Sequence, residues 1–287
     1  MILLLGQRTD PPLRAVAAEL ERMGAKYCCA DRELEVAQPW RPGSDAVLKL
    51  SGQVLPLAEV KSAYLRPFGL AAKTAVEAEA LAVLLAWGDQ SAARVLNRPS
   101  ASLPNNSKPL QTQWIAHFGL RIPETLITTD PSAAREFACR HGEVIYKSIS
   151  GVRSIVRRLS RDRFTELDHV RHCPTQFQRY IPGDDIRVHV FGDTVVAVRI
   201  VSDRDDYRYA ARDGGSIEAA MIELEPAVAD SLRSMVLDMG LLVAGIDLRI
   251  TPAGELYCLE INPSPAFTYY EQLAGVSMAR RIAELLV

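Results

Sequence analysis

The feature of the sequence that most constrains the fold is residues 245–262, which read GIDLRITPAGELYCLEIN. Two apolar stretches flank a Pro-Ala-Gly-Glu turn, so the segment predicts a β-hairpin. When the turn is centred on Ala253-Gly254, Asp247 lies directly opposite Glu260. Asn262 follows Glu260 by two residues and shares its face, because side chains alternate along a strand. The hairpin therefore predicts three oxygen-bearing side chains on one face of a sheet.

Facing carboxylates of this kind predict either a cation site or ordinary ion pairs. Directly opposed side chains have Cβ atoms about 4.5–5.5 Å apart, where two like charges repel each other. Mg²⁺ is commonly held by one or two carboxylates together with substrate phosphates. The alternative is that Asp247 and Glu260 pair with Arg249 and other basic residues on a solvated face. The apolar residues around them indicate buried strands, where an unpaired carboxylate is costly, and this favours the metal.

The composition excludes several classes of function. With 287 residues, the chain is long enough for two domains of about 150 residues each. A net charge of −2 provides no basic field to attract nucleic acid or an acidic membrane surface. The five cysteines lack metal-binding spacing, and no apolar run is long enough to span a bilayer. We therefore expect a cytoplasmic protein with reduced thiols.

Residues 1–98 alternate between strand and helix patterns, which predicts a small, mainly parallel α/β sheet. The expected strands are 2–5, 26–30 and 62–66, with a hairpin over 46–57 and helices over 11–23 and 72–96. Residues 97–109 are rich in Pro, Ser and Asn and predict a linker between domains.

The remainder of the chain predicts a second mixed region. Apolar and polar residues alternate from residue 176 onwards, with Gly192-Asp193 as a hairpin turn, which indicates antiparallel strands. The expected helices are 110–118, 132–141, 226–239 and 277–286, and the expected strands are 125–128, 144–148, 176–181, 185–191, 194–201, 243–250 and 256–261.

Three further blocks accompany the hairpin. They are NRPSASLPNNSKPLQTQWIAHFGLRIPETLIT at 97–128, VIYKSISGVRS at 144–154 and FQRYIPGDDIRVHVFGDTVVAVRI at 177–200. In this order the blocks resemble the ATP-grasp ligases, in which an Asp, a Glu and an Asn hold two Mg²⁺ against the ATP phosphates. The resemblance covers about two thirds of the chain and extends to RimK-type carboxylate–amine ligases. SDRDDYR at 202–208 and the segment 262–287 are similar to the graspetide (microviridin-type) peptide macrocyclases.

The resemblance implies an α/β chain with the α+β ATP-grasp fold. Its expected parts are an N-terminal α/β domain over 1–98, a small ATP-grasp subdomain over 99–175 and a C-terminal subdomain with the metal site over 176–287. The implied ligands are ATP and two Mg²⁺, with Mn²⁺ as an alternative ion. ATP would lie between the two subdomains.

The resemblance also assigns residues to ATP. Two lysines face the phosphates, a small-residue loop covers them, a hinge binds adenine, and an aspartate holds the ribose or stabilises the hinge. In this order the residues are Lys108 and Lys147; Ser150, Gly151 and Arg153; Gln178, Arg179, Tyr180 and Ile181; and Asp185. Arg179 stands where RimK-type enzymes have Glu, which argues against carrying over glutamate specificity.

The implied metal ligands are Asp247, Glu260 and Asn262, and the implied catalytic residues are Arg187, Arg199 and Arg208. Arg187 would hold the γ-phosphate and then the acyl-phosphate, whereas Arg199 lies two residues before the position of an arginine in RimK-type enzymes. A structural ion pair or a surface role is the alternative for each arginine.

The function implied is an ADP-forming ligase that activates a carboxylate as an acyl-phosphate and joins it to an amine or hydroxyl. The carboxylate would belong to a peptide or an amino acid, and a homo-oligomer is left open. Two other classes compete: a kinase of the same fold that phosphorylates a small molecule, and a nucleotide-binding protein without catalysis.

Overall fold

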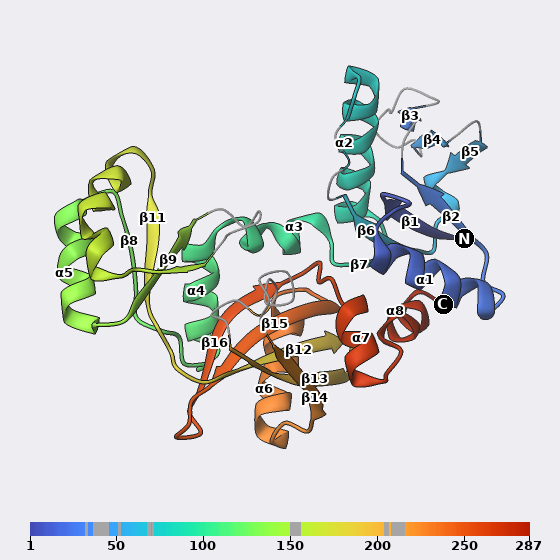
Figure 1. Ribbon diagram of the computed structural model, residues 1–287. Helices are drawn as coiled ribbons and strands as arrows, with labels where there is room; N and C mark the ends of the chain where they lie inside the picture. The colour runs from blue at the N-terminus through green and yellow to red at the C-terminus, as the bar shows by residue number, and fades with distance from the viewer. Residues whose placement is uncertain are drawn as a thin grey trace.

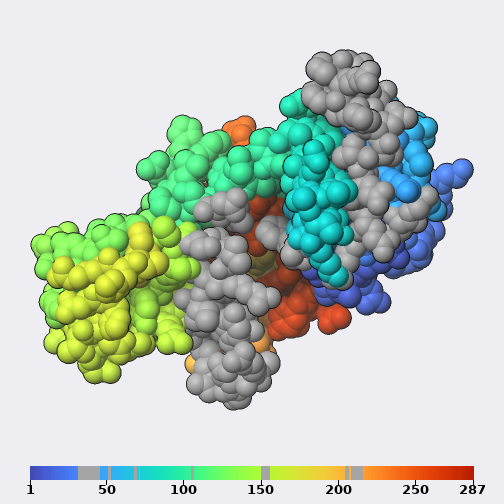
Figure 2. All heavy atoms as spheres, turned by 90° about the horizontal axis from the view of Figure 1, so that it is seen from above, coloured from blue at the N-terminus to red at the C-terminus, as the bar shows by residue number. Residues whose placement is uncertain are grey.

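The computed structural model describes residues 1–31, 34–36, 46–50, 53–67, 70, 72–149, 156–203, 207 and 216–287. These residues form four β-sheets with helices packed against them, which confirms the predicted mixture of α and β structure. Figure 1 shows the N-terminal part in blue and cyan at one end and the green-yellow part at the other. The orange and red part lies between them, and Figure 2 shows the same arrangement from above. None of the described helices is long and apolar enough to cross a membrane.

The N-terminal part is built on a parallel sheet. Its strands are β1 (Ile2–Gly6), β2 (Tyr27–Ala30), β6 (Ser62–Arg66) and β7 (Arg94–Leu96), and its helices are α1 (Pro11–Arg22) and α2 (Ala75–Gln90). The strand order is β2-β1-β6-β7, so the apolar strand β1 is central and buried. Ile2 and Leu4 pack on the side of α1, while Leu3 and Leu5 pack on the side of α2. A small antiparallel sheet of β3 (Leu34–Val36), β4 (Val47–Leu50) and β5 (Gln53–Pro56), followed by the 3-10 turn η1 (Leu57–Glu59), adjoins it.

The predicted helix over 72–96 is wrong in its second part. The helix α2 starts after Thr74, whose side chain accepts a hydrogen bond from the Glu77 amide, and it ends at Gln90. Val95 and Leu96 are buried in the parallel strand β7 instead. Tertiary packing against β6 has overridden the helical pattern of the sequence at this point.

The predicted linker is more ordered than expected, since it contains α3 (Pro99–Ser102) and the 3-10 turn η2 (Leu103–Asn106). Arg98 donates hydrogen bonds to four carbonyl groups at and after the end of α2. Asn97 is buried with a φ of 57°, and its side-chain amide bonds backbone groups of Leu242, Val243 and Pro263. These two side chains attach the linker to the parts on both sides of it.

The small subdomain contains the strands β8 (Thr125–Thr128), β9 (Val144–Ser148), β10 (Arg157–Arg158) and β11 (Thr175–Arg179), with helix α5 (Pro131–His141) and the 3-10 helix η3 (Arg161–His172). The strand order is β10-β9-β11-β8. Because β11 pairs with β8 and β9, the two sheets divide after Arg179, four residues beyond the predicted boundary. The division into domains itself stays a prediction.

The C-terminal sheet is antiparallel, with the strand order β14-β13-β12-β15-β16. Its strands are β12 (Asp184–Phe191), β13 (Thr194–Ser202), β14 (Ile217–Ile222), β15 (Val243–Ile250) and β16 (Leu256–Asn262). The surrounding helices are α4 (Lys108–His117), α6 (Pro226–Asp238), α7 (Thr268–Ala274) and α8 (Met278–Leu286). The sequence patterns did not predict β14, α7 or η3.

The two faces of this sheet are different. One face, here called the α6 face, carries Ile186, Val188 and Ile246, which pack with residues of α6 and α4. The other, here called the site face, carries Arg187, Asp247 and Glu260 near one end and an apolar cluster that reaches α7, α8 and α1. The last helix thereby connects the sheet to the N-terminal part (Figure 1). At the charged end of the site face, Asp247 and Glu260 line a cleft together with residues of the small subdomain.

Candidate nucleotide and metal site

The hairpin of β15 and β16 has the register that the sequence predicts at its charged end. Asp247 pairs with Glu260, and Gly245 pairs with Asn262. The register then shifts by one residue after Asp247, so that Leu248 faces Cys258. A bulge of this kind places one extra residue in one strand and is frequent beside functional sites. The predicted register therefore holds for the part of the hairpin that carries the three oxygen ligands.

Each of the two facing carboxylates has a cationic partner. Arg187 Nη1 lies 2.6 Å from Asp247 Oδ1, and Lys108 Nζ lies 3.2 Å from Glu260 Oε1. Both cations are buried, whereas both carboxylates remain partly exposed. Arg249, the partner that the ion-pair alternative proposed, instead binds Asp185 through two nitrogens. The carboxylates are therefore charge-balanced and still open on one side.

A cleft lies beside these carboxylates and brings five of the ten predicted nucleotide residues together. It is lined by Ile145, Lys147, Val156, Gln178, Arg179, Tyr180, Ile181, Tyr207, Asp247, Arg249, Leu259 and Glu260. Apart from Tyr207, the residues come from the small sheet and the segment before β10, from the connection after β11 and from the carboxylate hairpin, so the cleft is formed between the two sheets. Lys147 is buried at its wall and supplies positive charge to a cleft that Asp247 and Glu260 also line.

Lys108 is held in place by its helix. It is the first residue of α4, and Ser107 caps that helix by accepting a hydrogen bond from the Leu110 amide. Gln111, one turn further on, bonds both the amide and the carbonyl of Ile261. Residues three apart share a helix face, so this docking aims Lys108 at the neighbouring Glu260.

The sequence and the fold both resemble those of known proteins. Residues 105–286, more than half of the chain, match the model of the RimK-like ATP-grasp domain. The chain belongs to the RimK-like ATP-grasp family. A probable alpha-L-glutamate ligase of Histophilus somni (strain 2336) is 28% identical over 194 residues, which is 64% of each chain. The match thus spans 64% of the length of this curated relative, which is less than two thirds.

Solved structures of ATP-grasp ligases match almost the whole chain. The ligase PsnB complexed with minimal precursor is 26% identical, with a TM-score of 0.84 over 99% of this chain and 97% of that one. PsnB is also known in a complex with Mg and ADP. The macrocyclase MdnC of Microcystis aeruginosa MRC, bound with its precursor peptide MdnA, is 22% identical with a TM-score of 0.84 over 100% and 99% of the two chains. These matches confirm the predicted ATP-grasp fold and the resemblance to both groups of ligases.

The predicted hinge, residues 178–181, is surrounded by paired side chains. Two guanidinium groups contact the Tyr180 ring, with the guanidinium carbon of Arg158 3.9 Å and that of Arg249 5.6 Å from the ring centre. Arg249 also donates to the Ile181 carbonyl, and it connects this carbonyl to Asp185. Of the two roles predicted for Asp185, the geometry favours stabilisation of the hinge. Sequence reasoning named Arg249 only as an ion-pair partner of Asp247 and Glu260 and missed its contacts with Asp185 and Ile181, although its place two residues after Asp247 puts it on the same face.

Two further predicted hinge residues have clear partners. Gln178 is buried and donates to the Thr125 hydroxyl at 3.0 Å. Arg179 forms an ion pair with Glu124 at 2.5 Å and donates to the Tyr257 hydroxyl. Arg179, which stands where RimK-type enzymes have Glu, therefore contacts Glu124 and Tyr257 and also lines the cleft.

The structure does not bring Arg199 to the cleft. Its cross-strand partner is Ile186, so its side chain belongs to the α6 face, opposite to Arg187. There it forms an exposed ion pair with Asp184. The predicted catalytic position of Arg199 is corrected on this ground. The predicted residues Ser150, Gly151, Arg153 and Arg208 lie outside the described residues.

The residues that fit a metal are few. Within the described parts of the chain, no group of three His, Cys, Asp or Glu side chains is gathered for an ion. Asp247 and Glu260 provide two carboxylates, and Asn262 follows on the same face, where its Oδ1 accepts a hydrogen bond from the Ser264 amide. Two hard oxygen ligands with room for phosphate oxygens match the preference of Mg²⁺.

Arg66 is a second residue that sequence reasoning missed. It ends β6, is buried, and binds Asp10 at 2.6 Å and Ser264 Oγ at 2.8 Å. Ser264 follows Asn262 closely, so the N-terminal part reaches the loop beside the predicted metal ligands. A polar residue at the carboxyl end of a parallel strand is the signal that could have pointed to it.

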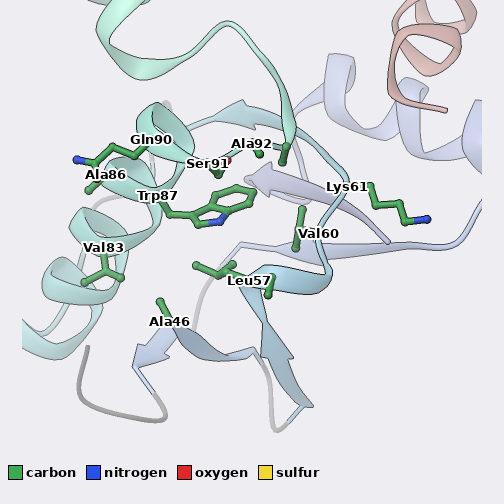
Figure 3. A pocket seen from close by; sticks show the side chains of 12 residues that line it. Ala46, Leu57, Val60, Lys61, Val83, Ala86, Trp87, Gln90, Ser91 and Ala92 are labelled. Atoms are coloured by element: carbon green, nitrogen blue, oxygen red, sulfur yellow. The ribbon is translucent and has the colours of Figure 1, made fainter. Parts of the chain in front are cut away.

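A larger cavity than this cleft lies elsewhere and has a different character. It measures about 690 Å³ and is lined mainly by apolar residues of the N-terminal part, among them Leu57, Val60, Val83 and Trp87. Figure 3 shows the Trp87 ring directed into it from α2. Lys61 is the one charged residue among the described residues of its lining. Phosphates need several fixed cations or amide groups, so the smaller charged cleft is the better candidate for a nucleotide.

Proposed function

We propose that this protein is an ATP-dependent ligase that activates a carboxylate as an acyl-phosphate and joins it to an amine or hydroxyl. The observation that carries the proposal is the facing pair of Asp247 and Glu260 at the wall of a cleft that also contains Lys147 and the hinge. Two carboxylates held on neighbouring strands would repel each other without cations. Mg²⁺ would bind between these carboxylates and the phosphates of ATP, and Lys147 would face the phosphates.

In this proposal the carboxylates bind the metal and the lysines face the phosphates. Asp247, Glu260 and Asn262 would hold Mg²⁺, which neutralises the phosphate oxygens when it is bound. Lys147 and Lys108 would face the phosphates as point charges. Lys108 now pairs with Glu260, so in this proposal it exchanges part of that contact for a phosphate when ATP binds.

The chemistry has two steps. A substrate carboxylate oxygen attacks the γ-phosphorus, the bond to the β-phosphate oxygen breaks, and ADP leaves. The amine or hydroxyl then attacks the acyl carbon, inorganic phosphate leaves, and the nucleophile loses a proton. Arg187 would stabilise charge on the phosphoryl oxygens in both steps, and such donors act best when they are held in place before reaction.

A peptide substrate is favoured over a free amino acid. The similarity to PsnB, a ligase solved with its precursor, extends over 99% of this chain and includes the N-terminal part. The similarity to the probable glutamate ligase covers 64% of the chain. A carboxylate side chain in a peptide is therefore the proposed electrophile, and its partner is an amine or hydroxyl.

The test uses the full-length protein with Mg·ATP and a set of peptides that contain both carboxylates and lysine or hydroxyl residues. We expect ADP release together with a product that has lost one water, and hydroxylamine should trap the activated carboxylate as a hydroxamate. A stable phosphorylated product would indicate a kinase. Nucleotide binding without ADP release for any peptide would favour a non-catalytic binding protein. Glu260→Gln is the matched control and should form neither product.

A further inference from the structure

Arg187 is held by three groups of different chemistry. It is buried on β12, where its Nη1 donates to Asp247 at 2.6 Å and its Nε donates to His189 Nε2 at 3.4 Å. Its guanidinium carbon lies 5.4 Å from the centre of the Tyr270 ring. Burial opposes the charge, but Asp247 and the neighbouring tyrosines outweigh burial and raise the pKa of Arg187. The side chain is therefore a permanent cation in a fixed setting.

His189 is an unusual neighbour for such a cation. It is completely buried, and burial together with the charge of Arg187 lowers the pKa of its imidazole well below the usual value. An arginine nitrogen can only donate, so His189 Nε2 is the acceptor and its proton resides on Nδ1. Nδ1 has no hydrogen-bond partner among the described residues. A buried donor without a partner is unfavourable, and an apolar ring of similar size would avoid that cost.

The surroundings of His189 fix its ring. It stacks nearly parallel to Phe191, with the planes at 3°, and lies 5.1 Å from the Tyr270 ring centre. Directly across the sheet stands Gly245, where a Cβ atom would lie 2.2 Å from Arg187 Nη2. Because Gly245 has no side chain, the Arg187 guanidinium can occupy the space beside it. His189 contacts the Nε edge of the same guanidinium.

We propose that His189 is a positioning residue for Arg187, acting as a neutral hydrogen-bond acceptor that fixes the guanidinium without reducing its charge. A carboxylate at this position would also accept from Nε, but it would place a second negative charge beside the one that Asp247 already supplies. The neutral imidazole adds no such charge, so the guanidinium stays available to the γ-phosphoryl group. This inference rests on the proposed function, in which Arg187 acts on that group.

The proposal is tested by nucleotide affinity, which needs no peptide substrate. Calorimetry gives the Kd of Mg·ADP and of a Mg-bound non-hydrolysable ATP analogue for the full-length wild type, His189→Phe and His189→Gln. We expect His189→Phe to reduce the preference for the triphosphate about 5-fold to 10-fold, because one charge-assisted contact is misdirected, with ADP affinity unchanged. His189→Gln should retain most of the preference, since its amide oxygen can accept from Arg187.

Several outcomes would overturn the role of His189. An unchanged preference in His189→Phe does so, as does an equal loss of affinity for both nucleotides, which a merely structural residue would cause. Failure of His189→Gln to recover the preference also counts against it. Melting curves verify folding, and His189→Leu replaces His189→Phe if the larger ring is not accommodated. If the wild type binds neither nucleotide, the proposed function fails as well; if it binds both, only the role of His189 is in question.

Discussion

The two faces of the C-terminal sheet are made by the same strands but have opposite characters. On the α6 face, Ile186, Val188 and Ile246 are buried among the residues of α6 and α4. On the site face, Arg187 and Asp247 alternate with them along β12 and β15, and Asp247, the ion-pair partner of Arg187, lines the cleft. Neighbouring residues on these strands therefore face opposite sides of the sheet, so that one packs in the core and the next belongs to the charged site face.

The arginines of the two faces make this difference concrete. Arg187 is buried and pairs with Asp247, whereas Arg199 is half exposed and pairs with Asp184. Exposed ion pairs contribute little because water screens them. A buried cation is costly to desolvate and is kept only with partners. Arg199 is thus a surface group on the α6 face, whereas Arg187, on the adjacent strand, is a functional candidate on the site face.

The largest expected effect comes from the matched pair Arg187→Ala and Arg199→Ala. Removal of Arg187 should lower ADP-forming turnover by about 10²–10³-fold, because the transferred phosphoryl group loses a fixed positive charge. Arg199→Ala should change turnover less than about twofold, since its ion pair is exposed. Steady-state ADP release measures both variants, and melting curves verify that each is folded. Equal losses in the two variants would contradict the functional division of the faces.

The position of Arg199 could have been predicted from the sequence. The turn at Gly192-Asp193 gives the register of β12 and β13, and this register places Arg199 opposite Ile186, which has the opposite orientation from Arg187. The carboxylate hairpin was predicted in the same way, and there the facing pair of Asp247 and Glu260 is confirmed. The bulge after Asp247 carries no local signal in the sequence, because it shifts the pairing by a single residue among apolar neighbours.

Contacts between distant segments could not be predicted. Lys108 meets Glu260 across 152 residues of sequence, and Arg66 meets Ser264 across 198. Each contact depends on how whole elements pack, which strand and helix periodicity does not specify. The N-terminal architecture followed from alternating patterns, whereas the end of α2 was overridden by packing of β7 in the sheet.

The next expected effect tests the α6 face. Ile246→Ala should reduce the free energy of unfolding by about 2–5 kcal/mol, since the residue is completely buried and its loss leaves a cavity. Ile246→Val should cost only about 0.5–1.5 kcal/mol. Denaturant titration measures both values. Mg·ATP affinity below the melting temperature should stay within about twofold of wild type, since the change removes packing but no phosphate contact. A large loss of affinity in the folded variant would show that the two faces are not separable.

A smaller effect is expected where the charged region continues onto β9. Lys147→Ala should weaken Mg·ATP binding by about 10-fold, because it removes one charge-assisted phosphate contact. Lys61→Ala is the matched control, as Lys61 is exposed and lines the apolar cavity of the N-terminal part (Figure 3). Calorimetry should find the Mg·ATP affinity of Lys61→Ala unchanged from that of the wild type. A loss in Lys61→Ala with none in Lys147→Ala would move the nucleotide site to that cavity.

The smallest expected effect is a pH dependence of stability from the site face. Burial and Arg187 keep the pKa of His189 well below the usual value of 6.5. In acid the unfolded chain therefore takes up a proton that the folded chain does not, so the stability contributed by neutral His189 is present above pH 6.5 and is lost as the pH falls below it. The loss from this group is at most about 1.4 kcal/mol per pH unit.

In the described part of the chain, the groups packed on the imidazole are Arg187, Phe191 and Tyr270, and of these Arg187 carries charge near neutral pH. Carboxylates elsewhere also titrate in acid, so the measured quantity is the difference between wild type and His189→Phe in denaturant titrations at pH 7.5, 6.5 and 5.5. Wild type should lose about 1 kcal/mol more than the variant between the two extremes. If both proteins lost the same free energy of unfolding, His189 would be charged in the folded state in acid. It would then contribute nothing to the acid sensitivity of the protein.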